Sequence, residues 1–176
     1  KLKKKKIKFE IIIINDGSKD RTYQIIKSLK KNNIKIINNY INLGKSSSLI
    51  KGIKIAKYEK IILIDSDMPY FEYLDKLIRL LNKDNFVYIN RRSKMSKLTG
   101  KSLNLYQICR YYIGSFVCLT INLLLLNKDI GDTQAGLKGF KKPKNFNRIK
   151  FISTKFFFDA ELMIIFYKSK IKLKSI

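Results

Sequence analysis

Histidine and tryptophan are absent from this chain of 176 residues. Without histidine, the protein has no Ser-His-Asp triad, no histidine general base and no histidine-ligated zinc site. Its two cysteines, Cys109 and Cys118, stand nine positions apart within an apolar helical pattern. This spacing matches neither a zinc motif nor a disulfide framework. We therefore expect both thiols to pack in a core or an interface, in a reducing compartment.

Long hydrophobic runs are also missing. The longest extends from Ile113 to Leu126, 14 residues interrupted by Asn122, whereas about 20 are needed to cross a bilayer. The run therefore predicts a buried or interfacial helix near residues 101–127. At the other end of the chain, the basic residues 1–8 precede an apolar stretch of only Ile11 to Ile14. That stretch is too short for a signal peptide, and we expect 1–8 to be a solvated basic tail.

Acidic residues are few. The chain has 13 of them and 38 basic residues, which gives a net charge of +25. The basic residues are 32 lysines and only 6 arginines, whereas surfaces that read nucleic-acid bases usually rely on arginine forks. So basic a chain should still be attracted to phosphates or to an anionic membrane. Its hydrophobic content of 45% is enough to bury a core, which excludes a wholly disordered basic chain.

Short apolar runs alternate with segments of helical periodicity along most of the chain, which is typical of an α/β domain with a largely parallel sheet. The expected strands are residues 9–14, 34–38, 60–64, 86–90 and 171–173. The expected helices cover residues 23–29, 49–56, 74–81, 101–127 and 158–168. The length suits one domain, which we place at residues 9–176.

Asp65 and Asp67 directly follow the expected strand 60–64. Open α/β sheets bind ligands outside the carboxyl ends of their strands. On an extended backbone, carboxylates at positions i and i+2 point to the same side and can approach one Mg²⁺ or Mn²⁺ ion. Such an ion can neutralise a diphosphate leaving group. The alternative is a strand-end turn that merely favours aspartate.

Two further turns follow the same logic. Asp16, Gly17 and Ser18 end the expected strand 9–14, and Asp16 can accept hydrogen bonds from a nucleobase or a ribose. The alternative is a plain turn in which Gly17 takes a positive φ. Gly44 and Lys45 open the next helical segment. They can contact a nucleotide phosphate, although a simple helix cap fits them equally well.

Several basic side chains can gather around a second phosphate. Arg91 and Arg92 follow the expected strand 86–90, Arg110 lies in the long helical segment, and Lys138 lies in segment 132–140. Taken singly, each is more often a solvated surface charge.

Five sequence blocks carry a resemblance to a known family. They are IIINDGSKDRT (12–22), NLGKSSSLIKGIKIAK (42–57), IILIDSDMPY (61–70), DTQAGLKGF (132–140) and FDAEL (158–162). In this order they resemble the family 2 glycosyltransferases, which have the GT-A fold. The last two blocks look most like those of the branch that glucosylates dolichyl phosphate. The resemblance implies a Rossmann-like three-layer α/β sandwich with a mostly parallel central sheet.

The resemblance also implies a role for each matching position. The metal would be held by Asp65 and Asp67, which would form the catalytic group together with Asp132 and Gln134. The nucleotide sugar would be held by Asp16, Gly17, Ser18, Gly44, Lys45 and Asp65. The acceptor phosphate and the sugar would be met by Arg91, Arg110, Ser115, Lys138, Asp159 and Glu161.

Three features depart from the family pattern. The family normally opens with an earlier strand, whereas only residues 1–8 precede the first expected strand here, so we expect the domain to be incomplete at this end. Ser46 and Ser47 replace the usual Gly-Gly pair after Gly-Lys. In the Arg-x-x-x-Ser pair of some relatives the serine follows by four, whereas Ser115 follows Arg110 by five.

The implied activity is inverting transfer of glucose from UDP-glucose to dolichyl or polyprenyl phosphate, which yields dolichyl β-glucosyl phosphate for protein N-glycosylation. The implied location is the cytoplasmic face of the endoplasmic reticulum membrane, with Mg²⁺ or Mn²⁺ as cofactor and no nucleic acid as partner. Three alternatives stay open at this point: transfer of mannose or another sugar by a related enzyme, a non-catalytic relative, and a basic nucleic-acid-binding α/β module.

Overall fold

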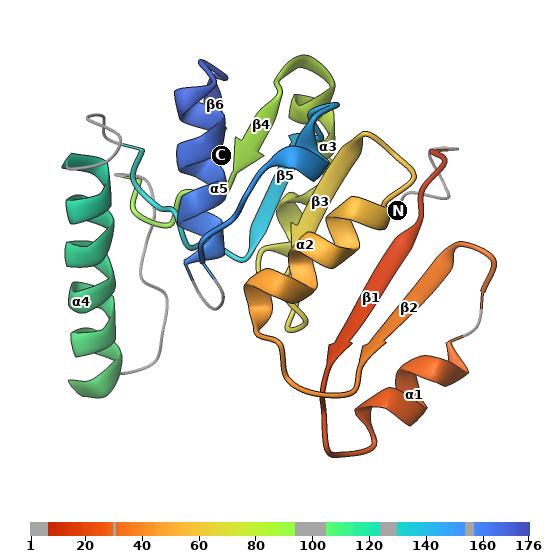
Figure 1. The fold of residues 1–176 in the computed structure, drawn as a ribbon. Coiled ribbons are helices and arrows are strands. Elements are labelled where there is room, and N and C mark those ends of the chain that lie inside the picture. The colour runs from red at the N-terminus through yellow and green to blue at the C-terminus, as the bar shows by residue number, and fades with distance from the viewer. Residues whose placement is uncertain (1–6, 30, 94–104, 124–129, 154–156) are drawn as a thin grey trace. The chain divides into compact units, whose positions relative to one another are not determined.

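The computed structural model describes residues 7–29, 31–93, 105–123, 130–153 and 157–176, and its strands and helices alternate along most of the chain (Figure 1). The chain divides into two compact units. Unit 1 comprises residues 1–61 and 140–161, and unit 2 comprises residues 62–139 and 162–176. Because both units combine segments from distant parts of the sequence, they do not correspond to two consecutive domains, and one domain over 9–176 stays a prediction.

Unit 1 contains a parallel pair of strands, β1 (Ile11–Asp16) and β2 (Ile34–Asn39), with helix α1 (Thr22–Ser28) between them in sequence. The β-branched isoleucines that open β1 favour an extended backbone. The register pairs Asp16 with Asn39 at the ends of the two strands. Strand β1 therefore begins and ends two residues later than the predicted 9–14, because its pairing with β2 extends through the polar residues.

Helix α2 (Lys45–Ile55) packs against β1. A Cβ atom at Gly52 would lie only 2.6 Å from Cδ1 of Ile14, so glycine allows this close approach. The carboxyl end of α2 is capped by Lys142, whose ammonium donates to the carbonyl oxygens of Ile53 (3.2 Å) and Ala56 (2.7 Å). Such a cation satisfies terminal carbonyl groups and complements the helix dipole.

The rest of the core of unit 1 is aromatic. The short 3₁₀ helix η4 (Phe146–Arg148) contributes a buried phenylalanine. The Phe146 ring lies 6.5 Å from that of Phe140 and 5.6 Å from that of Phe151, which in turn lies 5.3 Å from that of Phe158 (centroid distances). This chain of rings joins residues 140–153 to the start of helix α5 (Phe158–Lys168).

The four-stranded sheet has the order β3-β5-β4-β6. Its strands are β3 (Lys60–Ile64), β5 (Leu137–Lys141), β4 (Phe86–Tyr88) and β6 (Leu173–Ser175). Strand β4 pairs with β6 in parallel. Strand β5 runs antiparallel to β3, because Asp65 donates to the carbonyl of Gly136 (3.1 Å) and Lys142 donates to that of Glu59 (2.8 Å). The α/β class is confirmed. The sheet is mixed because it contains this antiparallel pair beside the parallel pair of β4 and β6, and β5 itself was not among the predicted strands.

The core of unit 2 lies between helix α3 (Leu74–Lys83) and the sheet strands. Leucines at i, i+3 and i+7 of α3 form its buried stripe, and a 3₁₀ helix, η2 (Phe71–Tyr73), precedes them. The buried residues of this core are Leu74, Leu77, Leu81, Val87, Ile89, Ala135 and Leu137.

Helix α4 (Leu105–Ile121) lies within the range predicted for the long helix. Cys118 is buried and its sulfur lies 3.7 Å from Oγ1 of Thr133. The Asn122 side chain accepts a hydrogen bond from the Ile130 amide (3.1 Å). Packing of Cys118 in the core is thereby confirmed, whereas Cys109 is exposed and does not pack in the core. Among the described helices, none has the length and apolar character to cross a membrane.

Candidate functional site

In unit 1, the carboxylate of Asp16 holds the turn that precedes α2. Its Oδ1 atom accepts hydrogen bonds from the Asn39 side chain (3.0 Å) and the Leu43 amide (2.9 Å), and its Oδ2 atom accepts one from the Gly44 amide (2.9 Å). Burial alone would raise the pKa of Asp16, but these donors and the Ser48 hydroxyl lower it overall. Asp16 is therefore an anion built into the Leu43–Gly44 turn.

Asn39 extends this network, and the sequence analysis did not identify it. Its side-chain amide donates to Asp16 and to the Ser48 hydroxyl (2.8 Å), and its carbonyl oxygen accepts from the ammonium of Lys51 (2.8 Å). Asn39 is buried. The available signal was its position directly after the second predicted strand, 34–38, where parallel pairing places it beside Asp16.

Glycine is required at two points of this turn region. Gly17 has φ 73°, and a Cβ atom there would lie 2.5 Å from the Asn42 nitrogen. Gly44, with φ 86°, precedes the first residue of α2. The expected positive φ at Gly17 is thus confirmed. Ser18 is exposed, while Ser46, one of the two serines in place of the family's glycines, is buried.

Lys45, the first residue of α2, forms an ion pair with Asp159 in the first turn of α5 (3.2 Å). The ion pair thus connects Lys45, which was predicted to bind the nucleotide sugar, to Asp159, which was predicted to contact the acceptor phosphate and the sugar. Glu161 accepts hydrogen bonds from the amides of Ile152 (2.7 Å) and Ser153 (2.9 Å) and from the Ser153 hydroxyl. Burial would raise the pKa of Glu161, but these donors lower it overall.

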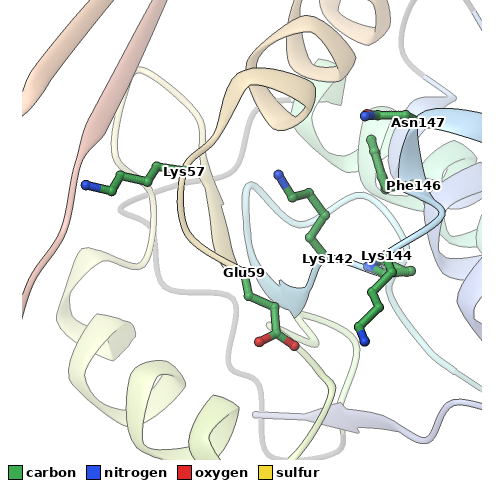
Figure 2. Close-up of a pocket in the computed structure, with 7 residues that line it drawn as sticks. Lys57, Glu59, Lys142, Lys144, Phe146 and Asn147 are labelled. Atoms are coloured by element: carbon green, nitrogen blue, oxygen red, sulfur yellow. The ribbon is translucent and has the colours of Figure 1, made fainter.

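A pocket of about 300 Å³ lies near the carboxyl end of α2 (Figure 2). The ammonium of Lys142 points toward α2, where it caps the helix. None of the residues predicted for the site lines this pocket, whose walls are Lys57, Glu59, Lys142, Pro143, Lys144, Phe146 and Asn147.

In unit 2, Asp65 and Asp67 lie on a turn instead of the extended backbone we expected. The Met68 amide donates to the Asp65 carbonyl (2.9 Å), which closes the turn directly after β3. Asp65 is half-buried and its Oδ2 atom lies against Gly136, where a Cβ atom would be only 2.5 Å away. Asp67 is exposed. Within the described residues, no group of three or more cysteine and acidic side chains gathers that could hold a metal.

The strongest charge cluster of unit 2 surrounds Asp132, whose exposed fraction is 0%. Arg91 donates to both of its carboxylate oxygens, through Nε and through Nη2 (3.0 Å), and Nη1 of Arg92 pairs with Oδ1 (3.0 Å). The Gln134 amide donates to the same oxygen (2.9 Å). Burial would raise the pKa of Asp132, but Arg91, Gln134 and Arg92 lower it overall. The hydrogen bonds to Asp132 raise the pKa of Arg91 despite its burial.

Arg92 also joins this cluster to α4. Its Nε atom donates to the Ser115 hydroxyl (3.2 Å), and a Cβ atom at Gly114 would lie 2.9 Å from its Nη2 atom. The arginine that contacts Ser115 is thus Arg92, from the loop after β4, and the sequence pattern had pointed to Arg110 of the same helix. Arg110 lies on α4 and its side chain is outside the described part of the chain. Lys138 is buried in β5 and donates to the carbonyl of Ala135.

The sequence model of glycosyl transferase family 2 matches residues 1–154. The chain therefore belongs to glycosyl transferase family 2, and the resemblance predicted from the five blocks is confirmed. The GT-A fold expected for the family is confirmed with it.

Individual proteins of known name are also similar to this chain. A dolichyl-phosphate beta-glucosyltransferase of Trichomonas vaginalis, ALG5A, is 29% identical over 148 residues, 80% of this chain and 44% of the relative. A second, ALG5D, is 28% identical over 180 residues, 96% of this chain and 53% of the relative. A poly-beta-1,6-N-acetyl-D-glucosamine synthase of Staphylococcus epidermidis is 49% identical over 59 residues, 33% of this chain and 14% of the relative. The chain spans about half the length of the dolichyl-phosphate relatives it matches.

Proposed function

We propose that this chain is part of an inverting glucosyltransferase that transfers glucose from UDP-glucose to dolichyl or polyprenyl phosphate. One observation carries the proposal: two dolichyl-phosphate beta-glucosyltransferases align over 80% and 96% of the chain. The product would be dolichyl β-glucosyl phosphate for protein N-glycosylation, and the reaction would take place at the cytoplasmic face of the endoplasmic reticulum membrane.

The transfer needs no general base, which suits a chain without histidine. A lipid phosphate is already anionic at neutral pH, so its oxygen attacks the anomeric carbon while the bond from that carbon to the diphosphate of UDP breaks. Catalysis then depends on placing the two substrates in line. Arg91, Arg92 and Ser115 would meet the acceptor phosphate, and Asp132 would orient the two guanidinium groups. Gln134, Arg110 and Lys138 would complete this side.

Asp65 and Asp67 would hold Mg²⁺ or Mn²⁺. Carboxylate oxygens on one turn suit these hard ions, which are commonly held by one or two carboxylates together with substrate phosphates. When bound, the ion would stabilise the negative charge that develops on the departing diphosphate.

The nucleotide sugar would be received by Asp16, Gly17, Ser18, Gly44 and Lys45. The bonds from Asp16 to the Leu43 and Gly44 amides support a role in shaping the turn that faces the nucleotide. Asp159 would position Lys45 through their ion pair. Glu161 would act on the acceptor and sugar side, and its bonds to the amides of Ile152 and Ser153 hold it in position.

An interfacial position for α4 is supported by its exposed apolar residues. Tyr112, Phe116 and Leu119 are exposed, and their spacing of four and three residues places them on one face of the helix. A helix with such a face can lie in the headgroup layer of a membrane, next to a lipid-linked acceptor.

The proposal is tested by incubating the protein with dolichyl phosphate, Mg²⁺ and radiolabelled UDP-glucose, and extracting the lipid product. We expect labelled glucosyl lipid, and no product with GDP-mannose. If product forms with GDP-mannose and not with UDP-glucose, the transferred sugar is mannose and the proposal of glucose transfer is wrong. The match to poly-N-acetylglucosamine synthases favours a second candidate, a transferase of N-acetylglucosamine, which UDP-N-acetylglucosamine in the same assay would reveal.

A further inference from the structure

Segment 148–153 of unit 1 presents cationic and apolar side chains together on its outer side. The exposed residues of the segment are Arg148, Lys150 and Ile152. The residues that alternate with them are half-buried: Ile149, Phe151 and Ser153. Ile149 has an extended backbone, with φ −69° and ψ 122°, and successive side chains of extended chain point to opposite sides. Ile152 therefore stands on the cationic side, where its exposed fraction is 90%.

The protein holds this segment firmly in place. The Glu161 carboxylate accepts hydrogen bonds from the amides of Ile152 and Ser153. On the inner side, the Phe151 ring lies 5.6 Å from that of Phe146 and 5.3 Å from that of Phe158. Single exposed apolar residues are common on protein surfaces. Ile152 differs because anchored backbone fixes it beside two cations, so its burial in a partner would require little further ordering of the chain.

A pocket of about 590 Å³ adjoins the segment. Three of its lining residues are cationic, three are apolar and none is acidic: Ile50, Lys54, Asn147, Arg148, Ile149, Lys150 and Phe151. A cationic rim over apolar side chains suits an amphiphile with an anionic head. Lysine and arginine also extend their apolar stems along such a surface while their charges reach the headgroups.

We propose that residues 148–152, with Lys54, form a membrane-docking surface that binds anionic lipid headgroups and inserts Ile152 into the bilayer interface. Charge complementarity selects this partner, because each cation gains from a negative lipid surface. A nucleic acid would use the cations but would leave Ile152 in water, since bases stack on aromatic side chains. This surface rests on the membrane location given in the proposed function and adds to it a second membrane contact, which lies in unit 1, apart in sequence from α4, and requires no glucosyl transfer.

Insertion of residue 152 can be observed directly, because the natural chain contains no tryptophan. The variant Ile152→Trp carries a single indole. We expect its fluorescence to shift to the blue, and to be quenched by brominated lipid, when vesicles of phosphatidylcholine with phosphatidylserine are added. The matched control is Ile25→Trp on α1, where residue 25 is also exposed. An unchanged spectrum for Ile152→Trp, or an equal shift for Ile25→Trp, would overturn the proposal.

The cations are tested with the double variant Arg148→Ala/Lys150→Ala in vesicle co-sedimentation. We expect its affinity for the phosphatidylserine vesicles to fall on the order of tenfold. The control Lys19→Ala/Lys27→Ala removes the same charge from exposed positions and should bind like the natural chain. Equal losses would indicate attraction by net charge alone and overturn the proposal. So would a loss of affinity for duplex DNA without a loss for vesicles. Because no sugar donor is present, failure here is distinguishable from failure of glucosyl transfer.

Discussion

Lys45 and Asp159 form an ion pair of 3.2 Å between the first residue of α2 and the first turn of α5. The two residues are more than a hundred positions apart in the sequence. The Asp159 side chain is only 5% exposed, so its charge is largely removed from water. A carboxylate in this position depends on its cationic partner far more than a surface carboxylate does.

Lys45→Ala should therefore lower the free energy of unfolding by about 2 kcal/mol, because it removes a cation from a buried carboxylate. Urea denaturation measures this change. Lys54→Ala, which removes an exposed lysine from the same helix, should change stability by less than about 0.5 kcal/mol. Adding Asp159→Asn should recover part of the loss. Equal effects of the two lysine variants would show that the ion pair contributes nothing to stability.

The elements that could be predicted best are those with a purely local cause. Strand β3 was expected at 60–64 and lies at Lys60–Ile64, because an apolar run there is bounded by charged residues. Helix α5 matches the predicted 158–168. Strand β6 begins two residues later than predicted. Lys170 takes a positive φ of 59° and the Ile171 amide bonds to the Phe166 carbonyl, so the end of α5 uses residues expected in the strand.

The remaining differences have tertiary causes. Strand β5 contains a buried lysine and a glycine in its centre, Lys138 and Gly139, and neither favours a strand on its own. Pairing with β3 determines its conformation. The same applies to the site: Asp132 was identified from its motif, but its contacts with Arg91 and Arg92 join residues about 40 positions apart. No local pattern encodes such a contact.

Asp132→Asn should lower the free energy of unfolding by roughly 3 kcal/mol, because the two arginines lose a fully buried counter-charge. Part of the loss is offset by water, since the Arg91 side chain is 38% exposed. Thermal unfolding followed by circular dichroism measures the change. Glu72→Gln, an exposed acidic position, serves as control and should be neutral. A neutral Asp132→Asn would mean that the cluster is solvated in solution.

Stability should fall when the solution is acidified. The pKa values of Asp16 and Asp132 lie below the ordinary 3.8, and that of Glu161 lies below the ordinary 4.5. Between the lowered and the ordinary values, the unfolded chain binds protons that the folded chain does not, so acid favours unfolding. We expect full stability above about pH 4.5 and a progressive loss below it. Urea unfolding at several pH values tests this, and Asp16→Asn and Asp132→Asn should each reduce the slope.

Asp67→Asn should abolish metal-dependent glucosyl transfer, if the proposed function holds, because an amide oxygen is a much weaker ligand for Mg²⁺ than a carboxylate. The expected loss of turnover is at least about a hundredfold. Since Asp67 is exposed, the variant should unfold at the same temperature as the natural chain. The assay uses radiolabelled UDP-glucose and dolichyl phosphate over a series of Mg²⁺ concentrations. Undiminished turnover would refute a metal-binding role for Asp67.

Glu161→Gln should loosen segment 148–153 without unfolding the protein. Both carboxylate oxygens accept hydrogen bonds from Ile152 or Ser153, and the amide group of glutamine can accept on one side only. Losing one such bond costs about 1–3 kcal/mol locally. Trypsin cleaves after Arg148 and Lys150, so we expect cleavage at these two positions to accelerate roughly tenfold or more. Mass spectrometry of the early fragments identifies the cut sites, and Glu72→Gln again serves as control. If cleavage of Glu161→Gln is no faster than that of the natural chain, the segment is held by its aromatic contacts instead of by the carboxylate.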